Sequence, residues 1–269
     1  MIAMTDSEFL EISGYIRKHY GVNLERKRPL IEGRLGFYID SSGYASYKDY
    51  FEYMKNDPTH RELANFLNRL TTNHTFFLRE EEHFDFYGRT VLPWIEHELN
   101  DRDLRVWSAG CSTGQEPYTL AIVTQNYIGA RASEWDSVIL ASDISDKALT
   151  TARDGIYPAE ELASVPDEWR RKYFTMHDRY SFKVTPDLRN KVAFKNFNLI
   201  EPFSVKKPFH AIFCKNVMIY FDSDTKSALV NKFYDALCDG GYFFIGHSES
   251  LSMLEHRFQY VNPSIYRKE

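Results

Sequence analysis

The sequence predicts an all-helical N-terminal region followed by an α/β domain with a largely parallel sheet. Between residues 5 and 72, apolar residues recur at helical spacing, and turn-forming residues separate the periodic stretches. From residue 104 onward, short β-prone runs alternate with helical patterns, which is typical of parallel strands joined by covering helices. The 269 residues are enough to bury one large core or two modest ones.

The N-terminal region divides into four predicted helices. The first stops at Gly21, and the second begins near Lys27, carries Pro29 in its first turn and ends at residues 41–43 (SSG). Apolar positions within 47–54 and 63–70 predict the third and fourth helices. Residues 71–79 (TTNHTFFLR) break the pattern as a connector, and residues 83–99 predict one further helix.

The α/β region is predicted to alternate strands and helices, with one insertion. Strands are expected at 104–108, 137–142, 192–196, 209–214 and 242–245, with helices at 116–128, 146–153 and 224–238. Residues 155–190 are polar and rich in aromatic side chains, and they predict a small inserted element.

The stretch 104–118 (LRVWSAGCSTGQEPY) carries the clearest local signal. A β-prone run leads into a turn bracketed by Gly110 and Gly114, and Pro117 is tolerated in the first turn of the following helix. A Rossmann-like domain brings its backbone close to a nucleotide-bearing ligand in this way. The full G-x-G-x-x-G spacing is missing, so an ordinary strand-to-helix connection explains the turn equally well.

Polar residues follow three other predicted strands, where ligands bind in such sheets. Asp143 follows the second strand, Asn198 and Leu199 follow the strand at 192–196, and Asn216 follows the strand at 209–214. Taken singly, Asp143 is explained as a helix cap and each asparagine as a turn residue. Together with the glycine turn, they favour a ligand that carries a ribose and a base.

Composition excludes several classes of protein. The net charge of −5 argues against general attraction to nucleic acid or anionic membranes, and no apolar run is long enough for a membrane span. The three cysteines are widely spaced and form neither a disulfide framework nor a zinc pattern, and the histidines show no metal-ligand spacing, so no metal is expected. We expect a cytoplasmic protein without direct membrane insertion.

Six segments in order along the chain resemble the CheR family, the chemotaxis receptor methyltransferases that use S-adenosylmethionine. They are 71–80 (TTNHTFFLRE), 106–118 (VWSAGCSTGQEPY), 141–144 (ASDI), 155–157 (GIY), 213–222 (FCKNVMIYFD) and 246–249 (GHSE). The resemblance implies a Rossmann-like class I methyltransferase domain with an inserted β-subdomain, preceded by an all-α domain. The expected boundaries are 1–75 for the helical domain, 76–90 for a connector, and 91–269 for the methyltransferase domain with its insert at about 155–190.

The resemblance also implies roles for individual residues. The cofactor would be contacted by Asn73, Thr75 and Arg79 of the connector, by Gly110, by Glu116 at its amino group and by Asp143 at its ribose. Asn198, Leu199 and Asn216 would line the adenosine end, and Arg79 and Tyr220 would lie nearest the reacting centre. The reaction would convert receptor glutamates to methyl esters and release S-adenosylhomocysteine. Without the resemblance, an ion pair to a nearby glutamate would explain Arg79, and core packing would explain Tyr220.

Three features of the sequence depart from the family pattern. Lys215 stands where many members carry Arg, and Phe37, Tyr38 and Asp40 replace residues that are often basic in the second helix, which weakens the case for receptor docking through that face. The segment 174–182 (FTMHDRYSF) is shorter than in enterobacterial members, so no binding of a C-terminal receptor pentapeptide is expected. The expected partners are the cytoplasmic methylation helices of the receptors.

Two other functions compete with this interpretation. A serine hydrolase would require the last glycine of G-x-S-x-G, which the segment 246–250 (GHSES) lacks, so we reject it. A non-catalytic S-adenosylmethionine-binding signalling or scaffold module would need Asp143 and Asn216 but would not need Arg79 and Tyr220. Both of these are present.

Overall fold

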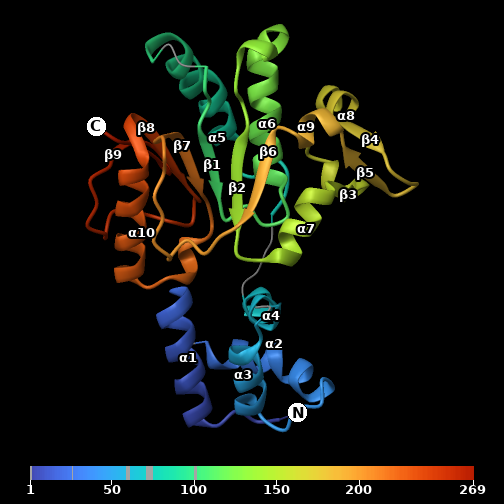
Figure 1. Cartoon of the computed structure of the whole chain (residues 1–269), viewed down its shortest axis with the longest axis vertical. Coiled ribbons are helices and arrows are strands. Elements are labelled where there is room, and N and C mark those ends of the chain that lie inside the picture. Colours follow the sequence, from blue (N-terminus) through green and yellow to red (C-terminus); the bar gives the residue numbers. More distant parts are fainter. Residues whose placement is uncertain (1, 26, 59–60, 71–74, 100–101) are drawn as a thin grey trace. The chain divides into compact units, whose positions relative to one another are not determined.

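The computed structural model describes residues 2–25, 27–58, 61–70, 75–99 and 102–269 (Figure 1). The chain forms two compact units. One unit consists of Met1–Asn73 with the segment Tyr220–Lys226, and the other consists of His74–Ile219 with Ser227–Glu269.

The first unit contains the four helices expected from the sequence: α1 (Asp6–Tyr20), α2 (Arg28–Ser41), α3 (Tyr47–Asn56) and α4 (Arg61–Leu70). Thr5 and Glu8 form a capping box at the start of α1, and Gly21 ends the helix in the left-handed conformation. The segment Tyr220–Lys226 packs with these helices, because the carbonyl of Tyr220 accepts a hydrogen bond from the amide of Asn23 at 2.8 Å.

The second unit is built on a seven-stranded sheet in the order β6-β2-β1-β7-β8-β10-β9. Its strands are β1 (Val106–Ala109), β2 (Ile139–Asp143), β6 (Val192–Asn196), β7 (Phe209–Cys214), β8 (Leu237–Ile245), β9 (Gln259–Asn262) and β10 (Ile265–Arg267). The first five in chain order pair in parallel, and β10 pairs antiparallel with both β8 and β9. Every residue of β1 is buried, as expected for a central strand covered on both faces. The predicted, largely parallel sheet is confirmed.

Helices α6 (Gln115–Ile128), α7 (Asp146–Asp154) and α10 (Ser223–Ala236) follow β1, β2 and β7 close to their expected positions. The helix expected over 83–99 is present as an unbroken helical stretch over 81–98, but only part of it is a regular α-helix. The structure has α5 (Glu81–Phe86) followed by two π-helical turns, η1 (Tyr87–Val91) and η2 (Trp94–Glu98). Pro93 lies between these turns and has no amide to donate, so the regular α-helical ladder cannot continue through it.

Residues 155–190 form the small inserted element that the sequence predicts. It holds a three-stranded antiparallel sheet, β3-β5-β4, made of β3 (Ile156–Pro158), β4 (Phe174–Met176) and β5 (Ser181–Val184). The short helices of this element are η4 (Ala159–Leu162), α8 (Asp167–Tyr173) and α9 (Pro186–Arg189).

The C-terminal edge of the sheet was not predicted. Strands β9 and β10 form a hairpin that extends the parallel sheet with antiparallel pairs. The strand expected at 242–245 begins earlier, since β8 starts at Leu237 and includes Gly240, which adopts a φ of +76° there. The helix expected over 224–238 therefore ends at Ala236.

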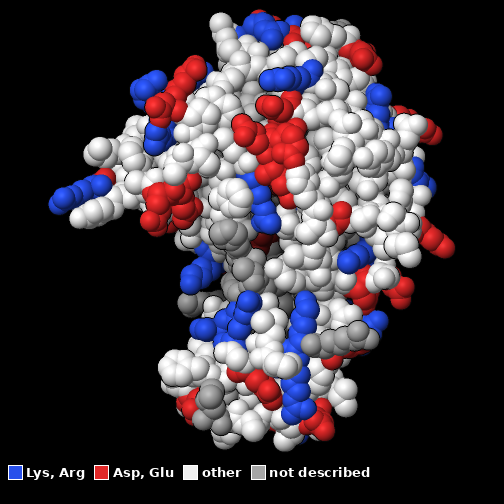
Figure 2. Space-filling view, turned by 180° about the vertical axis from the view of Figure 1, so that it is seen from behind, with Lys and Arg blue, Asp and Glu red and all other residues white. Residues whose placement is uncertain are grey.

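The surface carries charges of both signs, and the view in Figure 2 shows acidic and basic side chains on each unit. Among the described helices, none is both long and apolar enough to cross a membrane. The loops that leave β1, β2, β6 and β7 start at the same edge of the sheet, because these strands run in parallel. That edge brings most of the sequence-predicted residues into one region of the second unit.

Candidate functional site

The turn after β1 passes against the loop after β7. Gly110 adopts a φ of +87°, and a Cβ atom added there would lie 2.3 Å from Cγ2 of Val217. The amides of Gly110 and Cys111 both donate to the carbonyl of Ser142, at 2.8 and 2.9 Å, which ties the turn to the end of β2. Only glycine combines this backbone conformation with so close an approach.

Asp143 is the last residue of β2 and holds two backbone segments together. Its Oδ2 accepts a hydrogen bond from the amide of Ser112 and its Oδ1 accepts one from the amide of Ser145, both at 2.8 Å. Burial raises the pKa of this carboxyl, and the backbone hydrogen bonds act in the opposite direction. A carboxylate has about four lone-pair sites, so acceptor capacity is left for a ligand's hydroxyl groups.

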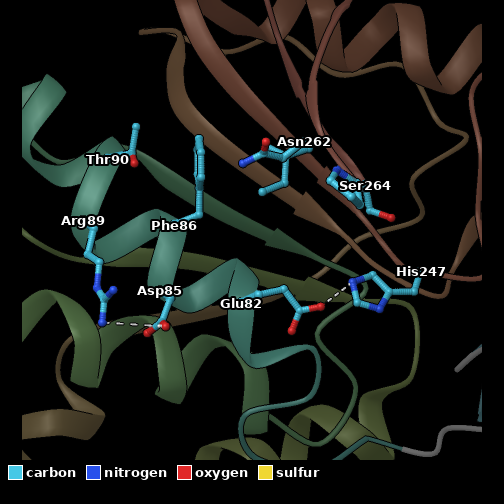
Figure 3. Close-up of a pocket in the computed structure, with 10 residues that line it drawn as sticks. Glu82, Asp85, Phe86, Arg89, Thr90, His247, Asn262 and Ser264 are labelled. Carbon is cyan, nitrogen blue, oxygen red and sulfur yellow. Dashed lines mark ion pairs between the residues drawn. The ribbon is translucent and has the colours of Figure 1, made fainter.

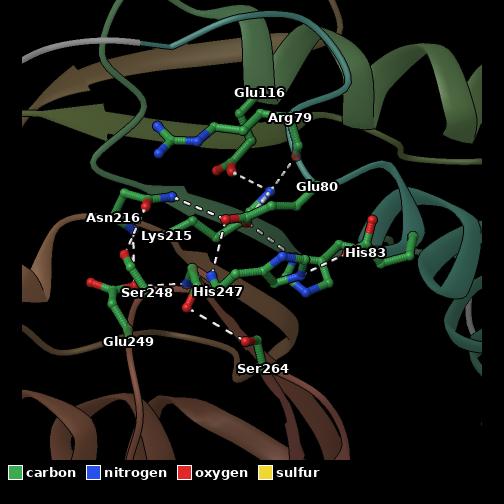
Figure 4. A network of polar contacts seen from close by, with 12 residues as sticks. Arg79, Glu80, His83, Glu116, Lys215, Asn216, His247, Ser248, Glu249 and Ser264 are labelled. Atoms are coloured by element: carbon green, nitrogen blue, oxygen red, sulfur yellow. Dashed lines mark hydrogen bonds and ion pairs between the residues drawn. The ribbon is translucent and has the colours of Figure 1, made fainter.

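Lys215 lies directly after β7 and forms the centre of a buried polar network (Figure 4). Its side chain is 3% exposed, and its Nζ donates to the carbonyl of Arg79 at 2.8 Å. The same ammonium lies 3.2 Å from Oε2 of Glu80 and 3.6 Å from Oε2 of Glu116, while Oε1 of Glu116 accepts a hydrogen bond from Ser108 at 2.7 Å. Glu116 therefore faces a cation.

Glu80 joins this network to the loops after β7 and β8. Burial acts to raise its pKa, but the ammonium of Lys215 and the amide of His247 outweigh burial and lower the pKa below its usual range. Glu80 is held at a φ of +61°, an uncommon conformation for a residue other than glycine. Its Oε1 accepts from the amide of His247 at 3.0 Å and from Nδ2 of Asn216 at 3.4 Å.

Asn198 and Leu199 lie in the loop after β6, which a lysine of α10 holds in place. Asn198 accepts a hydrogen bond from the amide of Ile200 through its own Oδ1, at 3.3 Å. Nζ of Lys232 donates to the carbonyls of Leu199, Ile200 and Glu201 at 2.9 to 3.1 Å. Burial lowers the pKa of Lys232, and these three acceptors compensate for part of its lost hydration.

The connector reaches these residues through the carbonyl of Arg79, which accepts the hydrogen bond from Nζ of Lys215. Asn73 lies outside the described residues. Thr75 is half-buried, and the Arg79 guanidinium lies 5.9 Å from the ring of Phe76. Tyr220 belongs to the first unit, where the ammonium of Lys27 lies 5.4 Å from its ring. Gly110, Glu116, Asp143, Asn198, Leu199, Asn216 and Arg79 all belong to the second unit.

Glu80, His83 and His247 each offer one ligand atom within 4.8 Å of the others, so they form a candidate metal-binding cluster. The Glu80 carboxylate is already paired with the Lys215 ammonium, and this positive charge opposes a divalent cation at the same place. Nε2 of His247 pairs with Glu82 at 2.7 Å. The arrangement favours an ion-pair network over a metal centre.

A pocket adjoins this network between α5 and the β9–β10 turn (Figure 3). It is lined by Glu82, Asp85, Phe86, Arg89, Thr90, His247, Asn262, Pro263, Ser264 and Ile265. Of the residues that the sequence nominates for the cofactor, none that the structure describes lines it. The pocket is therefore distinct from the loops that follow β1, β2, β6 and β7.

Sequence reasoning missed Glu80, Lys215 and Lys232. Glu80 ends the connector segment 71–80, and Lys215 was noted only as a departure from arginine, so both stood in segments already singled out. Their contact spans 135 positions of the chain and leaves no local pattern. Lys232 donates to backbone carbonyls, which every residue type supplies, so the residue types of the loop after β6 do not indicate these hydrogen bonds.

Comparison with known proteins identifies relatives of this chain along its length. A family model described as "CheR methyltransferase, SAM binding domain" matches residues 73–267, and one described as "CheR methyltransferase, all-alpha domain" matches residues 7–71. A chemotaxis protein methyltransferase of Borreliella burgdorferi is 36% identical and aligns over 99% of this chain and 96% of its own length. A chemotaxis protein methyltransferase of Escherichia coli is 35% identical over 98% of this chain and 92% of its own length.

A solved structure of magnesium protoporphyrin IX methyltransferase from Synechocystis with bound SAM is 14% identical to this chain. It aligns over 89% of this chain and 97% of that chain with a TM-score of 0.39.

Gly110→Ala is predicted to weaken binding of S-adenosylhomocysteine about tenfold or more, equivalent to about 1.4 kcal/mol, as measured by titration calorimetry. The added Cβ would displace either the turn after β1 or Val217. Gly129→Ala is the matched control, since Gly129 also has a positive φ, of +52°, but no atom lies within 4 Å of an added Cβ. Equal affinity in the two variants would contradict a role for the close approach at Gly110.

His83 is predicted to make the protein less stable as the pH falls from about 6.5 to about 4. Burial, followed by the Lys215 ammonium, lowers the pKa of His83 to about 4, although Glu80 and Glu82 act in the opposite direction. The unfolded chain binds a proton below its pKa of about 6.5, whereas the folded chain binds one only near pH 4, so acid favours unfolding by up to about 3 kcal/mol.

Urea unfolding at several pH values measures this contribution. The slope of the free energy of unfolding against pH should be smaller in His83→Gln than in the parent chain. His177→Gln, at an exposed histidine, should leave the slope unchanged. Parallel slopes in the parent and in His83→Gln would show that His83 titrates normally in the folded state.

Proposed function

The chain belongs to the CheR methyltransferase family, and on that premise we propose that it methylates chemotaxis receptors for sensory adaptation. The reaction transfers the methyl group of S-adenosylmethionine to receptor glutamate side chains, giving glutamyl methyl esters and S-adenosylhomocysteine. The observation that carries this proposal is the near full-length match to curated chemotaxis protein methyltransferases. The loops at one edge of the parallel sheet supply residues that suit this cofactor.

Methyl transfer to a glutamate carboxylate depends on how the reacting groups are positioned, because it needs no proton transfer. A glutamate side chain has a pKa of about 4.3, so it is ionised at neutral pH and needs no general base. S-adenosylmethionine supplies an electrophilic methyl group on a positively charged sulfur. The enzyme then has to hold the acceptor oxygen in line with that group and exclude water. No step of this scheme requires a metal ion.

Acidic residues would hold the two polar ends of the cofactor. Asp143 accepts the ribose hydroxyls, a role supported by its half-buried side chain and its remaining acceptor capacity. Glu116 binds the amino group of the methionine part, a role supported by the ammonium of Lys215 that already lies 3.6 Å from it. Asn198, Leu199 and Asn216 line the adenosine end, and Gly110 allows the turn after β1 to approach closely.

The connector and Tyr220 complete the proposed site. Asn73, Thr75 and Arg79 contact the cofactor, Arg79 also orients a carboxylate at the reacting centre, and Tyr220 positions the acceptor through its hydroxyl. We place the domain boundaries at 1–75 for the helical domain, 76–90 for the connector and 91–269 for the methyltransferase domain. The reaction takes place in the cytoplasm on the methylation helices of the receptors, without a pentapeptide tether and without nucleic acid.

Transfer of a tritiated methyl group from S-adenosylmethionine to receptor cytoplasmic domains tests the function. The expected result is incorporation that mild base releases as volatile methanol, because glutamyl methyl esters are base-labile. Receptor domains whose candidate glutamates are changed to alanine are the control and should stay unlabelled. A chain that binds S-adenosylmethionine yet labels no receptor domain would favour a non-catalytic module instead.

Arg79→Ala and Tyr220→Phe are each predicted to lower kcat by about 100-fold at saturating receptor and cofactor, since misplaced reacting groups lose rate on this scale. Arg89→Ala and Tyr260→Phe are matched controls, because the Arg89 side chain is 82% exposed and Tyr260 is 61% exposed. Near-full turnover in Arg79→Ala or Tyr220→Phe would remove that residue from the catalytic assignment.

A further inference from the structure

Glu249 is the last residue of the segment 246–249 (GHSE), to which the proposed function assigns no role. Its carboxylate lies against the loop after β7. Oε2 accepts hydrogen bonds from the amides of Asn216 at 2.9 Å and Gly246 at 2.7 Å, and Oε1 accepts one from the amide of Ile219 at 3.2 Å. One side chain thus collects three backbone amides from two segments.

The bonds to Asn216 and Ile219 are not local turn contacts. They join positions 33 and 30 residues apart in the chain, whereas the bond to Gly246 closes a turn within the segment itself. The amide of Glu249 also donates to the carbonyl of Gly246 at 2.9 Å, which completes that turn. The turn at 246–249 therefore orients the Glu249 carboxylate toward the loop after β7. The two long-range hydrogen bonds then fix the backbone of that loop.

The loop after β7 requires such support. Asn216 adopts a φ of +61°, a conformation that residues other than glycine hold only when their surroundings impose it. Its amide and that of Ile219 lie beyond the end of the strand, and Glu249 supplies acceptors for both.

The side chain of Asn216 is held from three sides (Figure 4). A Cβ added at Gly246 would lie 2.7 Å from Nδ2 of Asn216, so the amide group rests directly on the glycine backbone. Nδ2 donates to Glu80 at 3.4 Å, and Oδ1 accepts from Ser248 at 3.3 Å. The residues around Glu249 therefore determine both the backbone and the side-chain orientation of Asn216.

We propose that Glu249 is a positioning residue for the cofactor site, which sets the loop Asn216–Ile219 and through it the affinity for S-adenosylmethionine. This inference rests on the proposed function, because that function places Asn216 at the adenosine end of the cofactor. Glu249 acts on the ligand only through the loop.

Glu249→Gln tests the proposal, since it preserves the shape of the side chain but turns one acceptor oxygen into an amide donor. The dissociation constant for S-adenosylhomocysteine, measured by calorimetry, should rise about tenfold or more. Hydrogen exchange should accelerate at the amides of Asn216 and Ile219. Glu249→Asp keeps the charge but shortens the reach, so a smaller rise is expected; this variant also serves if Glu249→Gln does not fold.

Two controls separate positioning from general stability. Glu255→Gln removes an exposed carboxylate six residues further on and should change neither quantity. Phe258→Leu removes part of a buried aromatic contact with Phe243 and should lower the melting temperature without changing cofactor affinity. A Glu249→Gln variant that behaves like Phe258→Leu would overturn the positioning role.

The parent chain distinguishes failure of this inference from failure of the function. A parent that does not bind S-adenosylhomocysteine would overturn the proposed function and, with it, any role of Glu249 in cofactor affinity. A parent that binds, with unchanged affinity in Glu249→Gln and Glu249→Asp, would overturn only the role of Glu249.

Discussion

The site depends on one buried cation. Lys215 is almost fully shielded from water, and an ammonium in that environment is tolerated only when charged and polar partners replace its hydration. Its partners are Glu80 at the start of α5, Glu116 in the first turn of α6 and the carbonyl of Arg79. The face of the Phe84 ring lies 4.8 Å away and adds a cation–π contact. The connector, the turn after β1 and the loop after β7 meet at this cation.

The charges in this network also suit the proposed cofactor. Glu80 and Glu116 bring two negative charges to Lys215, so one negative charge is left to attract a further cation. The amino group of the methionine part provides such a cation, and a pyrophosphate would be repelled at the same place. A lysine suits this position because its compact ammonium reaches three acceptors lying in different directions, whereas a planar guanidinium favours paired ones.

The sequence predicts those parts of the molecule that have a local pattern. Alternating strands and helices, the turn at Gly110 and the polar residue Asp143 after β2 are all visible in short windows. Strands β9 and β10 are short, and Tyr260 in β9 is exposed although it is aromatic, so β9 shows no alternation of apolar and polar residues. The sequence therefore did not predict the antiparallel edge of the sheet. The ion pair between Glu80 and Lys215 was missed for a different reason, because only the folded chain brings these distant positions together.

The loops of the proposed site share a means of support that explains why they can be ordered before a ligand arrives. Loops at strand ends carry backbone groups that the sheet cannot pair. In this protein charged side chains form hydrogen bonds with these backbone groups. Asp143 accepts from amides beside the turn after β1, and Glu249 accepts from amides after β7. Lys232 donates to carbonyls after β6. A ligand that enters such a site does not have to order the loops, so more of its contact energy appears as affinity. Preorganised loops also hold the methyl donor in the fixed geometry that in-line transfer requires.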